Sequence, residues 1–312
     1  MTDITVKRAP GASYALVTAA YNEEAYLEQT ILSVSRQTIL PEKWIIVSDG
    51  STDQTDEIVR RYAEGCSFID LYRITEEHPR NFAAQVNAIN TGISRLDRSA
   101  YDFIGNLDAD ITLEPTYFEA VLQKFSRSSK LGLAGGVIYE EENGRFRNRR
   151  GNTVTSVAHA VQLFRRECLS TLGGYKVFPG GGTDWHAQVF LRMKGWEVRA
   201  FPDLPAFHHR RTGGAFGLRY WSQNGKEDYY MGTHPVIELF RMAKRFQEKP
   251  YVLGAIIRLA AFAWANVKSE ERPVTDDFVR FLRREQMQTL LSFLHWPNAV
   301  QGPKQEESNP GH

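Results

Sequence analysis

Short apolar runs rich in β-forming residues alternate with helical patterns between residues 14 and 205 of this chain. The run YALVTAA at residues 14–20 predicts a first strand, and apolar residues at near-helical spacing predict a helix over residues 24–36. This alternation is typical of βαβ units, in which a helix connects two neighbouring parallel strands. The sequence therefore predicts an α/β fold with a mainly parallel sheet flanked by helices.

The other elements of this region follow the same pattern. The runs WIIVSD, FIDLYRI, YDFIGNL and LGLAGGVIY predict strands, and further helices are predicted over residues 81–96 and 114–125. Ser51 and Gln54 fit a capping box that opens the helix after WIIVSD. A helix before Gly173 and Gly174 is expected to end there in left-handed backbone. The charged stretch EEENGRFRNRRGN, residues 140–152, predicts a mobile loop.

Beyond about Gly213 the pattern changes to helices with basic faces. They are predicted over residues 216–231, 234–247, 251–267 and 275–296. We therefore expect an α/β domain in residues 1–213 and a separate helical region in residues 214–300. The polar, Pro/Gly-rich residues 301–312 are expected to be disordered.

Residues 251–267 are the only candidate in the sequence for a membrane-spanning segment. They number only 17 and carry Arg258 near their centre, whereas a spanning helix needs about 20 apolar residues. We expect this stretch to be buried or interfacial. Basic residues beside Phe, Leu and Trp in the flanking helices suit contact with an anionic membrane surface, and they equally suit ordinary amphipathic helices packed on the α/β domain.

Composition narrows the class of protein. The 312 residues are 42% hydrophobic and 24% charged, which is the profile of a soluble globular protein. A formal net charge of +1 gives no global basic field for nucleic acid. Cys66 and Cys168 have no metal-binding spacing, and the N-terminus has no export-signal pattern. We expect a cytoplasmic protein, either free or peripheral on the inner face of the cell membrane.

Two acidic residues follow the predicted strand YDFIGNL. Asp108 and Asp110 flank one small residue, and like charges this close repel unless a cation or a proton separates them. Two carboxylates at a strand end can hold a hard divalent cation together with substrate phosphates. The alternative is a plain turn before Thr112 and Glu114, since short acidic turns are common.

Further acidic residues follow the neighbouring predicted strands. Asp49 ends WIIVSD, where its carboxylate can accept hydrogen bonds from a base or a ribose, or can serve as a turn residue before Gly50. Glu23, after the first strand, either lines the same crevice or opens a helix. Ligands of open α/β sheets bind at the carboxyl ends of strands. The absence of a Gly-x-Gly-x-x-Gly fingerprint disfavours a dinucleotide cofactor.

The last candidates lie later in the chain. Asp184 follows three glycines at the start of a predicted helix, where it can act as a general base on an acceptor hydroxyl or simply cap the helix. His208 and His209 follow the predicted strand LPAF, and Arg210 and Arg211 come next. Histidine can complete a metal shell and arginine can bind phosphate through two hydrogen bonds, although a solvated strand end would also have this composition.

Five motifs, in order, resemble those of the family 2 inverting glycosyltransferases, which have the GT-A (Rossmann-like) fold and use nucleotide-diphosphate sugars. The motifs are ALVTAAYNEEAYLEQTILSVSRQT, IIVSDGSTDQTDEIV, RNFAAQVNAINTGI, FIGNLDADITLEP and GGTDWHAQVFLRMKGW, across roughly residues 14–210. The resemblance implies a GT-A domain with Mg²⁺ or Mn²⁺ as its cofactor.

The resemblance also implies roles for individual side chains in donor binding. Ala20, Tyr21 and Glu23 would line the nucleotide. Asp49 would contact the base, and Arg80 would reach the base from the next loop.

A second group of implied roles concerns the metal and the reaction. Asp108 would approach the ribose and contribute to the metal site, and Asp110 would bind the metal. His208 or His209 would be a third metal or diphosphate contact, with Arg210 and Arg211 assisting the leaving group. Asp184 resembles the family's catalytic base, although the usual Glu-Asp pair is here Thr183-Asp184.

The implied reaction transfers one sugar, with a leaning to a UDP-linked donor, to a saccharide or lipid-linked acceptor in polysaccharide or glycolipid assembly. The Gln-x-x-Arg-Trp motif of the processive synthases does not occur in this sequence. Two alternatives remain open. Because Thr183-Asp184 replaces the usual Glu-Asp pair, the chain could be a nucleotide-sugar-binding protein without turnover. A sugar-phosphate nucleotidyltransferase is disfavoured because its Gly-rich phosphate signature is missing.

Overall fold

The protein is described by a computed structural model that covers residues 12–76, 82–149, 151–178, 181–210, 218–245 and 252–294. Its strands are β1 (Tyr14–Ala20), β2 (Lys43–Asp49), β3 (Ile69–Ile74), β4 (Phe103–Leu107), β5 (Ile111–Leu113), β6 (Leu131–Glu142), β7 (Arg145–Asn148), β8 (Val161–Arg165) and β9 (Glu197–His208). Its helices are α1 (Leu27–Ser35), α2 (Thr55–Ala63), α3 (Phe82–Arg95), α4 (Tyr117–Arg127), α5 (Arg166–Leu172), α6 (Thr183–Met193), α7 (Leu218–Tyr230), α8 (Pro235–Arg245), α9 (Val252–Val267) and α10 (Asp276–Leu294), with a short 3₁₀ turn at Arg98–Ala100.

Within the described residues, the strands form one mixed sheet in the order β3-β2-β1-β4-β8-β6-β9-β5, with β7 paired to β6. Strands β1 to β4 are parallel, and β6 and β9 are parallel to each other. Because β8 is antiparallel to both β4 and β6, the strands β6 and β9 run in the same direction as β1 to β4. The remaining two, β5 and β7, also run against their partners. The mainly parallel sheet expected from the sequence therefore carries three antiparallel strands.

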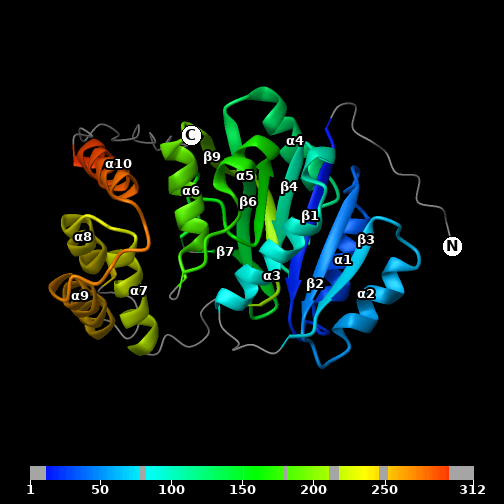
Figure 1. Ribbon diagram of the computed structural model, residues 1–312, viewed down its shortest axis with the longest axis horizontal. Helices are drawn as coiled ribbons and strands as arrows, with labels where there is room; N and C mark the ends of the chain where they lie inside the picture. Colours follow the sequence, from blue (N-terminus) through cyan, green and yellow to red (C-terminus); the bar gives the residue numbers. More distant parts are fainter. Residues whose placement is uncertain are drawn as a thin grey trace, which may run out of the picture.

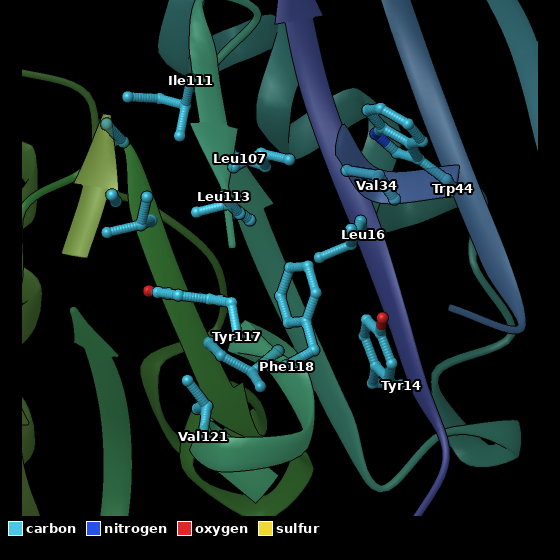
Figure 2. Close-up of a cluster of buried hydrophobic side chains, with 14 of the residues drawn as sticks. Tyr14, Leu16, Val34, Trp44, Leu107, Ile111, Leu113, Tyr117, Phe118 and Val121 are labelled. Atoms are coloured by element: carbon cyan, nitrogen blue, oxygen red, sulfur yellow. The ribbon is translucent and has the colours of Figure 1, made fainter. Parts of the chain in front are cut away.

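The sheet is buried on both faces because its strands are apolar at successive positions. Tyr14 and Leu16 of β1 pack on one face with α1 and α4, whereas Ala15 and Val17 pack on the other face with α3, α5 and α6. Figure 2 shows the first of these clusters, where Trp44 of β2 lies beside α1 and the side chains of α4 cover the strands. Side chains of successive strand residues point to opposite faces, so a continuous apolar run suits a strand between two layers of helices.

Two local predictions were wrong. The charged stretch 140–152 contains a hairpin: β6 extends to Glu142 and pairs with β7 through a turn in which Asn143 and Gly144 have φ of 53° and 75°. An Asn-Gly pair adopts this left-handed backbone readily, so it closes a tight hairpin despite the surrounding charge. The capping box was also misplaced, because α2 begins at Thr55 and its N-cap residue, Gln54, makes no side-chain cap hydrogen bond.

The C-terminal helices lie together at one side of the sheet, next to α6 (Figure 1). An apolar cluster joins them to the α/β region, with Phe178 and Val189 on one side and Met231, Phe278 and Leu282 on the other. Arg192 of α6 also forms two hydrogen bonds with Glu285 of α10, at 2.6 and 2.9 Å.

Helix α9 uses one face for packing and leaves the other exposed. Ala255, Arg258 and Ala265 are buried, whereas Ile256 and Trp264 are more than half exposed. None of the helices in the described part of the chain combines the length and the apolar character needed to cross a membrane. The predicted tail, residues 301–312, lies outside the described residues.

Candidate active site

The parallel strands end on one edge of the sheet, and several of the predicted site residues lie at or directly after these ends. Ala20 is the last residue of β1 and is buried, while Tyr21 directly after it is 43% exposed. Asp49 is the last residue of β2 and is buried. Asp108 follows β4, the neighbour of β1 on its other side. The edge thus combines a buried floor with an exposed aromatic ring.

Asp108 and Asp110 lie in the short connection between β4 and β5. Asp108 Oδ1 accepts a hydrogen bond from Asn106 Nδ2 at 3.2 Å and lies 3.8 Å from His159 Nδ1. Burial raises the pKa of Asp108, His159 opposes that effect, and the charge of Asp110 adds to it. The repulsion expected from the sequence is therefore present, and it is the kind that a bound cation relieves.

His208 is the last residue of β9 and His209 follows it directly, and the two side chains contact different groups. His208 Nε2 lies 3.1 Å from Asp110 Oδ2. Although burial alone lowers it, the pKa of His208 is raised by its hydrogen bond to Asp110 and by the neighbouring carboxylates. The His209 ring instead has its Nε2 2.8 Å from Thr112 Oγ1 and its Nδ1 3.8 Å from Glu141 Oε2. The structure thus brings His208, and not His209, to the candidate metal ligand.

Arg210 supplies a positive charge between two of the carboxylates. Its guanidinium pairs with Glu23, and its Nε lies 3.6 Å from Asp110 Oδ2. Burial raises the pKa of Glu23 and Arg210 opposes this effect, while Asp110 and Asp108 add to it. A cationic group therefore lies between the carboxylates that follow β1 and β4. It partly neutralises them, as a metal ion would.

A set of hydrogen bonds between two loops fixes the position of Glu23. Asn22 adopts left-handed backbone, with φ of 54°, and its N–H donates to Ser51 Oγ at 3.2 Å. The Glu23 N–H donates to Thr55 Oγ1 at 2.7 Å, and the Glu24 N–H donates to an Asp53 carboxylate oxygen at 3.0 Å. Sequence analysis missed this role, because Ser51 looked like a helix cap. The clustering of Ser, Thr and Asp after β2 was the signal that pointed to it.

Asp184 lies in the first turn of α6. Thr183 before it is fully buried and donates a hydrogen bond to the Lys176 carbonyl at 2.9 Å, so this threonine acts as a structural residue. Burial raises the pKa of Tyr175, and Asp184 and Asp108 both add to that effect. The charges of Asp184 and Asp108 thus both act on the Tyr175 hydroxyl.

A second carboxyl group, Glu227 of α7, lies beside the start of α6. A Cβ atom placed on Gly182 would lie 2.6 Å from Glu227 Oε1, and one placed on Gly181 would lie 3.6 Å from Glu227 Oε2. Burial, then the charges of Asp228 and Asp184, raise the pKa of Glu227 to about 8. Nothing in the sequence near residue 227 indicated this proximity.

Two predicted site residues, Arg80 and Arg211, lie outside the described residues. Among those that are described, no group of three Asp, Glu, His or Cys side chains is arranged to hold a metal ion by itself. This arrangement still fits Mg²⁺ or Mn²⁺, which are commonly held by one or two carboxylates together with the phosphates of a substrate. Asp110 with His208, and Asp108 nearby, supply such a partial set of ligands.

Comparison with known proteins gives one matching family. Residues 15–195 match the family model described as Glycosyl transferase family 2. Poly-beta-1,6-N-acetyl-D-glucosamine synthase of Staphylococcus aureus is 30% identical over 147 residues, which are 47% of this chain and 32% of the synthase. Chondroitin synthase of Escherichia coli is 28% identical over 224 residues, which are 67% of this chain and 30% of that protein. The chain spans about a third of the length of these relatives.

Solved structures show the same fold at low sequence identity. A mannosyltransferase from Pyrobaculum calidifontis, in complex with GDP-Man and Mn²⁺, superimposes with a TM-score of 0.55 and 17% identity over 94% of this chain and 84% of that one. TarS residues 1–349 of S. aureus, in complex with UDP-GlcNAc, give a TM-score of 0.50 and 15% identity over 88% of this chain and 82% of that one.

Proposed function

Because this chain belongs to glycosyl transferase family 2 and has the GT-A fold, we propose that it is a metal-dependent, inverting glycosyltransferase. It transfers a single sugar from a nucleotide-diphosphate sugar, with UDP as the favoured nucleotide, to a saccharide or lipid-linked acceptor. The observation that carries this proposal is the meeting of Asp108, Asp110, His208 and Arg210 at the carboxyl edge of the sheet. Polysaccharide or glycolipid assembly would use such a reaction.

The donor nucleotide would lie across the ends of β1 and β2. Tyr21 offers an exposed aromatic surface beside buried Ala20, and Asp49 offers a carboxylate that can accept hydrogen bonds from a base imide. Glu23 would face the nucleotide from the loop that Ser51 and Thr55 hold in place. Arg80 would reach the base from the loop before α3. Of these groups, Ala20, Tyr21, Glu23 and Asp49 lie within the described residues, and they would form the floor of the proposed nucleotide site.

The metal would be held by Asp110 and His208, with Asp108 contacting the ribose and contributing to the site. A bound Mg²⁺ or Mn²⁺ would neutralise the charge of the diphosphate leaving group. Arg210, now paired with Glu23 and Asp110, is positioned to bind the phosphates as well, and Arg211 follows it in the chain. His209 remains a proposed contact only through the phosphates, because its ring faces Thr112.

Asp184 would act as the general base. Its carboxylate would accept the proton of the acceptor hydroxyl as that oxygen attacks the anomeric carbon from the face opposite the diphosphate. One displacement of this kind inverts the anomeric configuration, and it needs no covalent intermediate on the protein.

One alternative has an observation in its favour. Thr183 stands where the family usually has a glutamate, and its hydroxyl is engaged with the Lys176 carbonyl, so a nucleotide-sugar-binding protein without turnover would also fit. Release of nucleoside diphosphate separates the two functions, because only the transferase produces it. A sugar-phosphate nucleotidyltransferase gains no support from the described residues.

The experiment that tests donor binding is a panel of UDP- and GDP-linked sugars read by thermal shift with Mn²⁺. A ligand at 100 times its dissociation constant adds about 2.7 kcal/mol to the free energy of unfolding. We expect one donor class to stabilise the wild type only with Mn²⁺ present, and Asp110→Asn to lose that stabilisation. If no nucleotide sugar stabilises the protein, the proposed function is wrong.

We also propose that the C-terminal helices contact an anionic membrane surface. Exposed apolar side chains lie along α8 and α9, namely Val236, Leu239, Phe240, Val252, Leu253, Ile256, Trp264 and Val267. Lys268 lies 5.3 Å from the centre of the Trp264 ring, so a basic group and an aromatic group lie together here, as they do in interfacial helices. An anionic bilayer is the partner that this combination complements.

Liposome flotation tests this contact. The wild type should float with phosphatidylserine-containing vesicles, binding should weaken at high salt, and neutral vesicles should recover little protein. Trp264→Glu should reduce flotation. Tyr21→Ala, which changes the proposed nucleotide site, should leave flotation unchanged. Equal recovery with and without anionic lipid would contradict the proposal.

A further inference from the structure

Glu140 is a buried carboxylate that the proposed reaction does not use. It lies near the carboxyl end of β6, it is 9% exposed, and its Oε1 atom has no hydrogen-bond partner among the described residues. Burying a carboxylate without full hydrogen bonding costs free energy. Glu140 therefore does not owe its position to the stability of the fold.

The strand register directs Glu140 toward the candidate metal ligand. β6 and β9 are parallel neighbours, with Glu140 beside His208 and Tyr139 beside Phe207. The rings of Tyr139 and Phe207 lie 6.1 Å apart on one face of the sheet. Since side chains alternate between faces, Glu140 and His208 share the other face, on which His208 reaches Asp110.

Glu140 thus lies on the face of the sheet from which the His208 imidazole reaches Asp110. Histidines that bind metals commonly donate their second ring N–H to a carboxylate or carbonyl, which fixes the ring orientation and the tautomer. Because His208 Nε2 faces Asp110, a carboxylate near Nδ1 would be the partner that fixes the ring.

On the basis of the proposed function, we propose that Glu140 is a positioning residue for His208. It would hold the imidazole in the orientation in which Nε2 faces Asp110, so that both side chains could bind a divalent cation. Loss of such a supporting partner typically reduces metal affinity by about 10–100-fold.

The test measures the affinity of the protein for Mn²⁺, by electron paramagnetic resonance of the free ion, at saturating UDP or GDP. Glu140→Gln keeps the shape of the side chain and removes its charge, and it should weaken Mn²⁺ binding by about tenfold or more. Glu141→Gln is the matched control, because the neighbouring Glu141 faces His209 on the opposite face of the sheet. That variant should bind Mn²⁺ as the wild type does.

A double-mutant cycle shows whether Glu140 acts through His208. In the His208→Ala background, Glu140→Gln should cause no further loss of Mn²⁺ affinity. Wild-type affinity in Glu140→Gln would overturn the proposal, and so would a full additional loss in the double variant. Glu140→Asp, read beside circular dichroism, replaces Glu140→Gln if the latter does not fold, and it should also weaken Mn²⁺ binding. If the wild type binds neither nucleotide with Mn²⁺, the proposed function itself fails.

Discussion

At the scale of single residues, the proposed site brings several carboxylates together, and the neighbouring basic side chains neutralise them only in part. Asp108 and Glu23 both have a pKa raised first by burial, and each feels the charge of Asp110. Arg210 pairs with Glu23 and approaches Asp110, while the basic group beside Asp108 is His159, whose Nδ1 lies 3.8 Å from Asp108 Oδ1. A divalent cation with a diphosphate would redistribute these charges, because it offers two positive charges to the carboxylates and several oxygens to Arg210.

Asp184→Asn tests the assignment of the general base at this scale. The amide keeps the shape of the side chain but cannot accept a proton, so release of nucleoside diphosphate should fall by about 10²–10⁴-fold. The Mn²⁺-dependent thermal shift with the donor should persist, since Asp184 lies outside the nucleotide floor. Full activity in this variant would show that another group is the base.

Glu227 supports a prediction about the pH dependence of stability. Its pKa is raised from 4.5 to about 8, first by burial and then by Asp228 and Asp184, while Arg258 and Arg241 oppose the shift. Between these two pH values the folded protein holds a proton that the unfolded chain releases. The stability contributed by this proton is complete below the lower value and is lost as pH rises through the upper one.

Glu227→Gln cannot ionise and should escape that loss. The free energy of unfolding, measured by urea denaturation, should increase in the variant relative to the wild type as pH rises from about 5 to about 9. Glu64→Gln, which changes an exposed glutamate, controls for general effects of pH. Parallel pH profiles for wild type and Glu227→Gln would mean that Glu227 is charged throughout.

At the scale of elements, the position of Asp184 depends on how α6 begins. Gly182 is the N-cap residue of α6 and adopts left-handed backbone with φ of 84°. Its missing side chain leaves room for the carboxyl of Glu227 from α7 and for Met231. A helix of the C-terminal region thus packs directly against the turn that carries the proposed base.

Gly182→Ala should therefore affect turnover more than stability. The added Cβ would lie 2.6 Å from Glu227 Oε1 and 2.9 Å from Met231 Cε, so the start of α6 or the Glu227 side chain must move. We expect diphosphate release to fall at least about tenfold, since small displacements of a catalytic group are costly. Steady-state kinetics with the donor identified by thermal shift would measure this.

Gly173→Ala is the matched control for that variant. Gly173 also has left-handed backbone, with φ of 75°, but a Cβ there would meet nothing within 4 Å. Both variants should lose about 1–2 kcal/mol to backbone strain, and Gly173→Ala should keep its turnover. Equal turnover in the two variants would show that the contact between α6 and Glu227 is catalytically unimportant.

At the scale of the whole molecule, a buried ionic network holds the C-terminal helices together. Arg258 of α9 pairs with Asp228 of α7 and donates from Nε to Glu238 of α8 at 2.9 Å, and all three residues are at most 5% exposed. Burial raises the pKa of Glu238 to about 7, Asp228 adds to the effect, and Arg258 opposes it. The central Arg258, which argued against a membrane span in the sequence, thus has an internal role.

Arg258→Ala should destabilise this region strongly. Removing one partner of a buried ion pair leaves uncompensated charge and typically costs about 3–5 kcal/mol. Urea denaturation should show that loss, and limited proteolysis should cut first within the C-terminal helices. Arg280→Ala is the control, because the ion pair of Arg280 with Asp277 is exposed and such pairs contribute about 0–1 kcal/mol. Similar losses in both variants would contradict the structural role of Arg258.

The spacing of apolar residues predicted most of the strands and helices, because side chains that face the core recur at short, regular intervals along each element. β1 matches its predicted residues 14–20, and the family resemblance is confirmed by the match over residues 15–195. The hairpin of β6 and β7 was missed because the end of β6 and all of β7 consist mainly of charged residues, so they carry no apolar pattern. The grouping of Asp49, Asp108 and Asp110 was predictable, since parallel strands bring their carboxyl ends to one edge.

The sequence by itself determined the α/β fold, its family and the edge of the sheet at which we propose the site, because these follow from local patterns and from the direction of parallel strands. Only the tertiary structure decided that His208 rather than His209 faces Asp110, and that Glu140 lies on the same face of the sheet as His208. It also decided that Glu227 lies against the start of α6. These contacts depend on strand register and helix packing between residues far apart in the chain, which no local pattern specifies.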